Sequence, residues 1–270
     1  MFPKYANGQP LLIKNIPGAA GVPGITEFMT AKADGYTIAH WNGAQTIKTH
    51  MSKTPYTATQ FKGVANIVND NFYFLVPADS PFKTLQDIID YAKANPGELT
   101  FGNAGIGGGN YFAEIMFEDY AGIDAIGVPF QGGGPLVTGL MSGQVDVGAN
   151  IAPEGANNIK SGQLRVLGLF AEKRLEAFPD APTAKEQGID LVLSQYRGIV
   201  APTDTPKEIL QQLEDIFRQV SQDPEFIEKI AELGATIDFL GGEDYDKTIA
   251  ADDKNYKQII MEKKLGDLYQ

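Results

Sequence analysis

Short apolar runs alternate with longer amphipathic segments along almost the whole chain. The short runs are rich in β-branched and aromatic residues, so they predict β-strands. The expected strands cover residues 11–14, 36–41, 63–68, 72–76, 99–101, 125–130, 145–149, 164–170 and 198–201.

The segments between these runs have helical spacing and carry start and stop signals. Thr84 can cap a helix that ends at Asn95-Pro96-Gly97. Thr205, followed by Pro206 and by Glu208 three residues after the cap, predicts a capping box. Further helices are expected over 183–188, which begins with Thr183 and Glu186, over 223–234 and over 245–263.

Alternation of strands and helices predicts an α/β architecture with mixed, mainly parallel sheets. Parallel sheets bind ligands beyond the carboxyl ends of their strands. The length of 270 residues is sufficient for two lobes. We expect residues 1–102 and 201–270 to form a discontinuous lobe one, and residues 103–200 to form lobe two.

Charge and cysteine content narrow the classes of function. The net charge is −12, from 22 basic and 34 acidic residues, and such a surface repels nucleic acid and anionic membranes. The absence of cysteine excludes disulfides, thiolate nucleophiles and cysteine-based zinc sites. No apolar run approaches the ~20 residues that span a bilayer, so we expect no direct membrane insertion.

The stretch "FGNAGIGGGN" (101–110) is the strongest candidate for a binding site. It places glycines between an expected strand and a helix-like segment. N–H groups at a helix start carry partial positive charge, and glycines let a ligand approach them. Asn103 and Asn110 can add side-chain donors. The pattern fits either an anion-binding turn or a tight turn without a ligand.

Nucleotide and hydrolase motifs do not fit this loop. A dinucleotide fingerprint fails at Asn110, and a P-loop fails because Gly108 stands where lysine is required. The sequence contains no G-x-S-x-G and no H-E-x-x-H motif. His40 and His50 have no evident partner, so the residues name no catalytic group, metal site or cofactor.

Six segments in one order carry a resemblance to a known family. Together they resemble the solute-binding proteins of tripartite tricarboxylate transporters, the Bug-type extracytoplasmic receptors, over essentially the whole chain. The segments are "NIPGAAGVPG" (15–24), "ADGYTI" (33–38), "VPFQGGGPLVTGLMSGQVD" (128–146), "IKSGQLRVLGL" (159–169), "FPDAPTAKEQG" (178–188) and "APTDTPKEI" (201–209).

The resemblance implies a two-lobed periplasmic-binding-protein fold of type II that captures a small mono- or dicarboxylate between its lobes. It also implies delivery of that ligand to the membrane permease subunits of a bacterial tripartite transporter. By resemblance the ligand-binding residues are Asn42, Gly43, Ala44, Asn103, Ala104, Gly105, Gly107, Gly108, Gly109, Asn110, Gln131, Gly132, Gly133, Asn150, Tyr196 and Arg197.

Several of these positions depart from the family pattern or allow a second interpretation. Gly108 and Gly109 stand where the family usually carries hydroxyl residues, and Asn150 stands where it often has an acid. Arg197 can clamp a carboxylate, or it can be a surface arginine paired with an acid. Tyr196 can wall a pocket or pack in the core.

The first residues, "MFPKYANGQP", resemble the end of the family's first long helix. We therefore expect a chain truncated at its N terminus, without the first strand of lobe one and without a signal peptide. The parent protein would be periplasmic or otherwise extracytoplasmic, with or without a lipid anchor. Two other functions fit the same residues. One is an α/β enzyme acting on an acyl or phosphoryl group, and the other is a module that presents its ligand to a membrane sensor.

Overall fold

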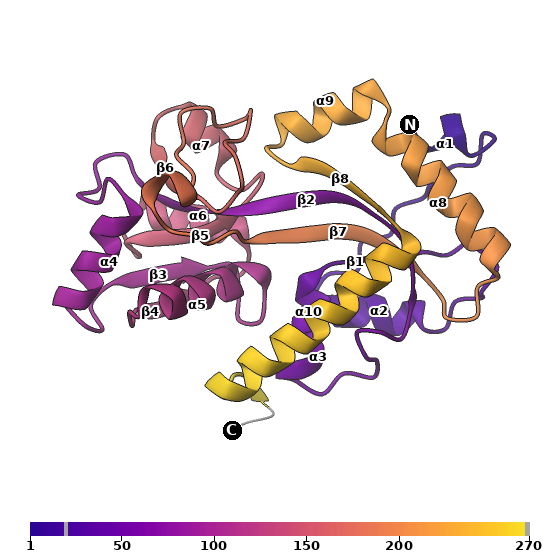
Figure 1. Cartoon of the computed structure of the whole chain (residues 1–270), viewed down its shortest axis with the longest axis horizontal. Helices are drawn as coiled ribbons and strands as arrows, with labels where there is room; N and C mark the ends of the chain where they lie inside the picture. The colour runs from indigo at the N-terminus through magenta and orange to yellow at the C-terminus, as the bar shows by residue number, and fades with distance from the viewer. Residues whose placement is uncertain (19–20, 268–270) are drawn as a thin grey trace. The chain divides into compact units, whose positions relative to one another are not determined.

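A computed structural model describes residues 1–18 and 21–267. Residues 19 and 20, inside the segment 15–24 quoted above, and residues 268–270 lie outside the described residues. The chain divides into two compact units (Figure 1). Unit 1 comprises residues 1–69, 196–230 and 237–270, and unit 2 comprises residues 70–195 and 231–236.

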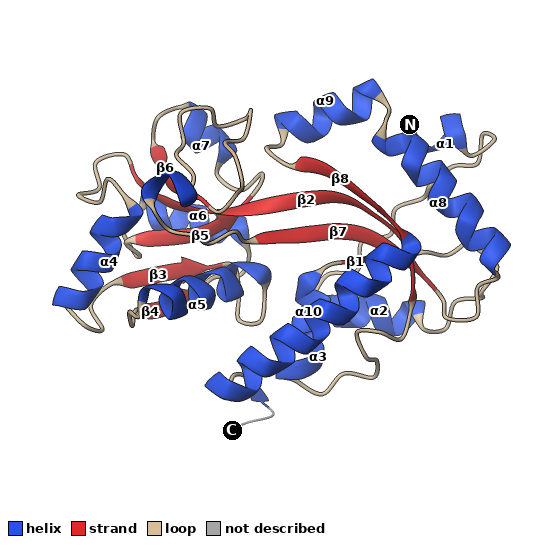
Figure 2. Ribbon diagram, in the orientation of Figure 1, coloured by secondary structure: helices blue, strands red, loops and turns tan. Residues whose placement is uncertain are grey.

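The sheet of unit 2 is mixed. Strand β3 (Thr100–Asn103) lies between β4 (Ile126–Pro129) and β5 (Val147–Ile151) and is parallel to both. Strand β2 (Lys62–Pro77) pairs antiparallel with β5 and with β6 (Leu164–Leu169), as Figure 2 allows the reader to follow. The expected parallel arrangement is therefore found in β4, β3 and β5, whose carboxyl ends lie at one edge.

Aromatic rings fill the core of unit 2. The ring of Phe74, fully buried on β2, lies 4.8 Å from that of Phe101, 4.9 Å from that of Phe117 and 4.6 Å from that of Phe170. Such edge-to-face pairs add stabilisation beyond the burial of apolar area. The helices of this unit are α4 (Leu85–Ala94), α5 (Gly109–Ala121), α6 (Gly133–Met141), α7 (Ala156–Lys160) and the short 3-10 helix η2 (Lys185–Gln187).

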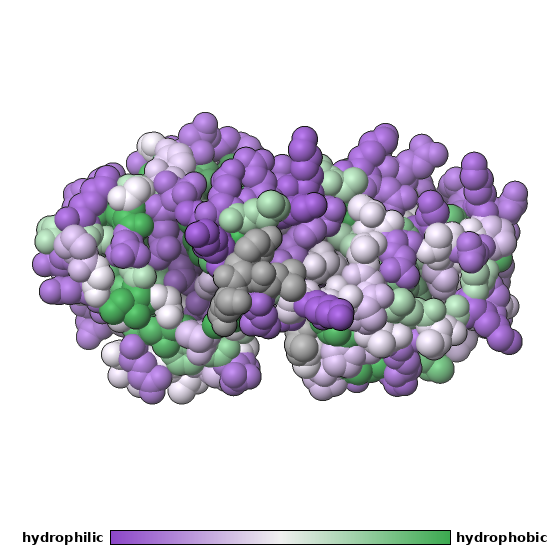
Figure 3. All heavy atoms as spheres, turned by 90° about the horizontal axis from the view of Figure 1, so that it is seen from below, coloured by the Kyte–Doolittle hydropathy of each residue, from purple (hydrophilic) through white to green (hydrophobic). Residues whose placement is uncertain are grey.

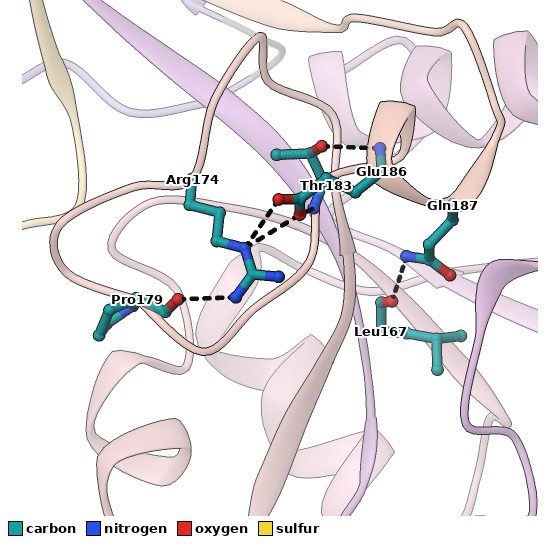
Figure 4. Close-up of polar contacts among 6 residues, drawn as sticks. All are labelled: Leu167, Arg174, Pro179, Thr183, Glu186 and Gln187. Carbon is teal, nitrogen blue, oxygen red and sulfur yellow. Dashed lines mark hydrogen bonds and ion pairs between the residues drawn. The ribbon is translucent and has the colours of Figure 1, made fainter.

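The expected short box before Gly188 is confirmed (Figure 4). The amide N–H of Thr183 donates to Glu186 at 2.8 Å, and the amide N–H of Glu186 donates to the Thr183 hydroxyl at 3.1 Å. The guanidinium of Arg174 holds the same carboxylate from outside at 3.0 Å. The neighbouring Gln187 donates to the carbonyl of Leu167 on β6 at 2.9 Å, which ties this turn to the sheet.

Unit 1 is built around a second aromatic cluster. Strand β1 (Ala39–Trp41) pairs antiparallel with β7 (Ser194–Ala201), and β8 (Thr236–Gly241) pairs with β2. Trp41 is fully buried, and its ring lies 5.8 Å from that of Tyr56. The helices are α1 (Phe2–Tyr5), α2 (Val22–Phe28), α3 (Gly43–Met51), α8 (Lys207–Ser221), α9 (Pro224–Glu232) and α10 (Gly242–Lys263).

Three expectations about local structure are wrong. Residues 11–14 are not a strand, and Leu12 and Ile13 are 87% and 73% exposed. The expected strands 63–68 and 72–76 are one strand, β2, and Asn69, which lies between the two runs, donates from its side chain to Asp238 on β8. The helix after Thr205 begins at Lys207 without a side-chain cap.

The observed units also differ from the expected lobe boundaries. Residues 70–102 pack in unit 2, because Phe72, Leu99 and Phe101 belong to the same apolar cluster as Phe117. Figure 3 shows one face of the molecule, on which hydrophilic residues predominate around smaller apolar patches. Within the described part of the chain, no helix is both long and apolar enough to cross a bilayer.

Candidate functional site

The carboxyl edge of β3, β4 and β5 gathers most of the residues that the sequence proposed for binding. Asn103 pairs with Pro129 at the ends of β3 and β4, and Gly102 pairs with Gly148 on β5. The loop after β3 leads directly into α5, and the loop after β4 leads into α6. The amide of Phe130 donates to the carbonyl of Asn103 at 2.9 Å, which joins the two loops.

The glycine turn before α5 needs glycine for its backbone conformation. Gly105 and Gly107 have φ of +127° and +81°, in the left-handed region that other residues rarely adopt. Ala104, half-buried, lies between Asn103 and this turn. Gly108 has an extended conformation and is the N-cap residue of α5. The first helical hydrogen bond runs from the amide of Phe112 to the carbonyl of Gly108, at 3.2 Å. The N–H groups before it point out of the helix start.

Asn103 supports this turn from inside rather than presenting its side chain. Its Oδ1 accepts from the amide of Gly105 at 3.1 Å, and its Nδ2 donates to Glu114 at 2.8 Å. Asn103 is 1% exposed and Glu114 is 2% exposed. Burial raises the pKa of Glu114 to about 8, although the hydrogen bond from Asn103 opposes this shift. A hydrogen bond from Asn103 to a ligand would therefore compete with these two internal bonds, and the expected contact stays a prediction.

Asn110 and Asn150 share one partner that the sequence analysis did not identify, Glu154. Its Oε2 accepts from Asn110 Nδ2 at 3.0 Å, from Asn150 Nδ2 at 3.3 Å and from the amide of Ile151 at 3.1 Å. Asn110 also donates to the carbonyl of Ala149 at 2.9 Å. Asn150 is fully buried, and its Oδ1 has no hydrogen-bond partner among the described residues.

The helix starts themselves lie against side chains of unit 2. A Cβ atom at Gly133, in the first turn of α6, would collide with the carboxylate of Glu154. A Cβ atom at Gly109, in the first turn of α5, would collide with the side-chain amide of Gln195. These two glycines let oxygen acceptors approach the helix starts. Gly132, the cap of α6, has a φ of +112°, and Gln131 before it is exposed.

The remaining proposed residues lie in unit 1. Asn42 caps α3, because its side chain accepts from the amide of Ala44 at 2.8 Å while its own amide donates to Gln45 at 2.8 Å. A Cβ atom at Gly43 would lie 3.1 Å from the hydroxyl of Tyr256. The side chain of Asn42 thus has a structural task, and its expected contact with a ligand stays a prediction.

Tyr196 packs in the core of unit 1. It is 6% exposed, its hydroxyl lies 3.3 Å from that of Thr46, and its ring lies 5.5 Å from that of Tyr245. Packing is thus the interpretation that fits its surroundings. Arg197, half-buried on β7, precedes Gly198, which pairs with Trp41. Its expected contact with a carboxylate stays a prediction.

The residues that sequence reasoning missed are Glu114, Glu154 and Gln195. Gln195 directly precedes Tyr196, which the sequence analysis did name. The only sequence signal for Glu154 was its position shortly after the expected strand 145–149, whose end lies at the carboxyl edge of the sheet. Among residues 1–18 and 21–267, no three His, Cys, Asp or Glu side chains are grouped as a metal site requires.

Comparison with known proteins decides the family. The model of the tripartite tricarboxylate transporter family receptor matches residues 4–265. The chain belongs to this receptor family. A UPF0065 protein from the gbd 5′ region of Cupriavidus necator is 33% identical over 96% of this chain and 79% of its own length. The family resemblance of the six ordered segments is thereby confirmed.

Solved receptor structures share the fold. A TctC solute-binding protein from Polaromonas superposes with a TM-score of 0.80, at 26% identity, over 97% of this chain and 91% of its own. The R. palustris protein Rpa4515, solved with adipate, superposes with a TM-score of 0.86, at 23% identity, over 96% of this chain and 88% of its own. The expected two-lobed binding-protein fold of this receptor is confirmed.

Proposed function

We propose that this receptor binds a small mono- or dicarboxylate at the carboxyl edge of β3, β4 and β5 in unit 2. The observation that carries the proposal is the start of α5. Two glycines in the left-handed region, Gly105 and Gly107, turn the chain so that the N–H groups of the first helical turn face outward. Such groups, together with the helix dipole, favour an anion.

The chemistry of this edge supports binding without catalysis. The polar side chains described there include the amides of asparagines and of Gln195 and the carboxylate of Glu154, which accepts three hydrogen bonds from the protein. The other buried acid, Glu114, lies beneath the turn and bonds to Asn103. The hydrogen bonds to these two acids come from amide groups, whereas acyl or phosphoryl transfer needs a nucleophile beside a base. Adipate in the related Rpa4515 structure also supports a carboxylate ligand.

We place the receptor outside the cytoplasm, where it would deliver its ligand to the permease subunits of a tripartite transporter. Membership of the receptor family supports this assignment. Co-purification with the permease subunits would test it. Binding of the ligand by the receptor, with no stable or transient association with those subunits, would favour a sensing role.

The glycine turn can be tested with Gly108→Val. Gly108 has a φ of −85°, which valine tolerates, and a Cβ atom there would meet the carbonyl oxygen of Gly105 at 3.2 Å. We expect a modest loss of stability and at least a tenfold rise in Kd for small organic acids, since the branched side chain blocks the helix start. Isothermal titration of the acids that stabilise the wild type would measure this.

Gly24→Val provides a matched control in α2 of unit 1. A Cβ atom at Gly24 would only touch Ile16, at 3.6 Å, so affinity for the acids should be retained. Wild-type affinity in Gly108→Val would remove the glycine turn from the binding site. Binding of a sugar or nucleotide, with no organic acid bound, would overturn the proposed function itself.

A further inference from the structure

Glu154 brings a negative charge to the edge at which a carboxylate ligand is expected. Its Oε2 accepts hydrogen bonds at 3.0 to 3.3 Å from two side-chain amides, those of Asn110 and Asn150, and from the backbone amide of Ile151. The donors come from the first turn of α5 and from the end of β5. These three amide donors could otherwise bind an anionic ligand, but they are already bonded to the carboxylate of Glu154.

The backbone of Glu154 is fixed as well. The Tyr73 hydroxyl donates to its carbonyl at 2.6 Å, and its amide donates to the carbonyl of Ile151 at 2.8 Å. The side chain is half-buried, and its carboxylate lies where a Cβ atom of Gly133 would be. The absence of a side chain at Gly133 lets the carboxylate lie against the start of α6. This carboxylate is thus held between two helix starts.

Its position has a consequence for the ligand. Asn110 belongs to the first turn of α5, so an acid bound to the N–H groups of that turn lies beside Glu154. A second carboxylate on the ligand, directed toward Glu154, would repel it in a site partly removed from water. An ammonium or hydroxyl group in that place would donate a hydrogen bond to the carboxylate, and bonds to an ionised acceptor are the stronger ones.

We propose that Glu154 determines ligand specificity, so that the receptor prefers acids carrying an ammonium or hydroxyl group over the corresponding dicarboxylates. This inference rests on the proposed function, because it requires an acid at the start of α5. It names the ligand class more narrowly: amino acids and hydroxy acids with one carboxylate near α5 and a hydrogen-bond donor near Glu154.

The test compares acids of equal chain length that differ at one end. The three sets are succinate with 3-aminopropionate and 3-hydroxypropionate, glutarate with 4-aminobutyrate and 4-hydroxybutyrate, and adipate with 5-aminopentanoate and 5-hydroxypentanoate. Titration calorimetry gives the Kd of each acid for the wild type, Glu154→Gln and Glu154→Ser. Circular dichroism establishes that both variants are folded, and the serine variant removes the charge without adding an amide.

In at least one set the wild type should bind the amino or hydroxy acid more tightly than the dicarboxylate. In both variants the ratio of the two Kd values should shift at least tenfold toward the dicarboxylate. Glu98→Gln, the same change at an exposed residue before the amino end of β3, should leave every ratio unchanged.

Four results would overturn the inference, and they differ in what else they imply. If the wild type prefers the dicarboxylates, Glu154 does not select against them. If both variants bind all acids more tightly by the same factor, Glu154 is an internal competitor that the ligand displaces. Acids that bind with ratios insensitive to Glu154 leave the proposed function intact. Binding of none of the acids would overturn the proposed function together with the inference.

Discussion

At the scale of single residues, Asn103 connects the glycine turn before α5 to the buried carboxyl group of Glu114. Asn103 bonds both to the turn amide of Gly105 and to Glu114, whose pKa burial raises to about 8. In the unfolded chain the same carboxyl ionises near its ordinary value. Between these two values the folded state binds the extra proton, so the free energy of unfolding falls as the pH rises.

Glu114→Gln should remove this pH dependence. Below the unfolded pKa the acid is protonated in both states, so wild type and variant should differ least there. From about pH 4.5 to 8 the free energy of unfolding of the wild type should fall by up to ~1.4 kcal/mol per pH unit through Glu114. In the variant the glutamine does not titrate, so this contribution is absent. Urea unfolding at pH 5 and pH 8 measures the difference. An unchanged slope in the variant, equal to that of Glu98→Gln, would contradict the assignment.

At the scale of elements, two threonines show which start signals the sequence reveals. The hydroxyl of Thr84 accepts from the amide of Asp87 at 3.1 Å, and the amide of Thr84 donates to Asp87 at 2.9 Å. The hydroxyl of Thr205 has no partner among the described residues, because Pro206 is extended with a ψ of 144° and α8 begins after it. Similar local sequences therefore give one capped and one uncapped helix.

The substitution Thr→Val at both positions should separate the two cases. Thr84→Val should lower the free energy of unfolding by about 1 kcal/mol, the usual loss of a cap. Thr205→Val keeps the shape, removes a buried hydroxyl without a partner and should leave stability equal or raised. Chemical unfolding of the two variants is the measurement. Equal losses at both sites would mean that Thr205 also caps α8.

The sequence predicted those parts of the fold that depend on local pattern. Most strands, the caps at Thr84 and Thr183 and the glycine turn before α5 follow from neighbouring residues. The continuity of β2 did not, because the side-chain amide of its buried Asn66 donates to the carbonyl of Asp238, on a strand 172 positions away. Glu154 was missed partly for the same reason: its partner Asn110 lies 44 positions away and reaches it only once β3 and β5 are parallel neighbours.

At the scale of the whole molecule, strand β2 belongs to both units. Residues 62–69 lie in unit 1 and residues 70–77 in unit 2. The single tryptophan of the sequence, Trp41, is fully buried in unit 1 and reports on that unit alone. Because one strand contributes to both cores, we expect the two units to unfold in one transition.

Phe74→Leu, a change in the core of unit 2, should therefore move the unfolding transition of Trp41. The smaller side chain at this position should lower the free energy of unfolding by about 1–2 kcal/mol. The urea midpoints measured by fluorescence and by circular dichroism should shift together. Ile126→Val, at a 47% exposed position of the same unit, should move neither signal. Two separate transitions, with the fluorescence midpoint unchanged, would show that the units unfold independently.

The three consecutive glycines after Gln131 differ in how freely evolution can replace them. Gly132 is constrained by its φ of +112°, and Gly133 by the carboxylate that lies against it. Gly134 has neither constraint, since a Cβ atom there would meet nothing within 4 Å. Among descendants of this sequence, Gly134 can drift to alanine or a larger residue, whereas a lineage that loses Glu154 also frees Gly133 to acquire a side chain.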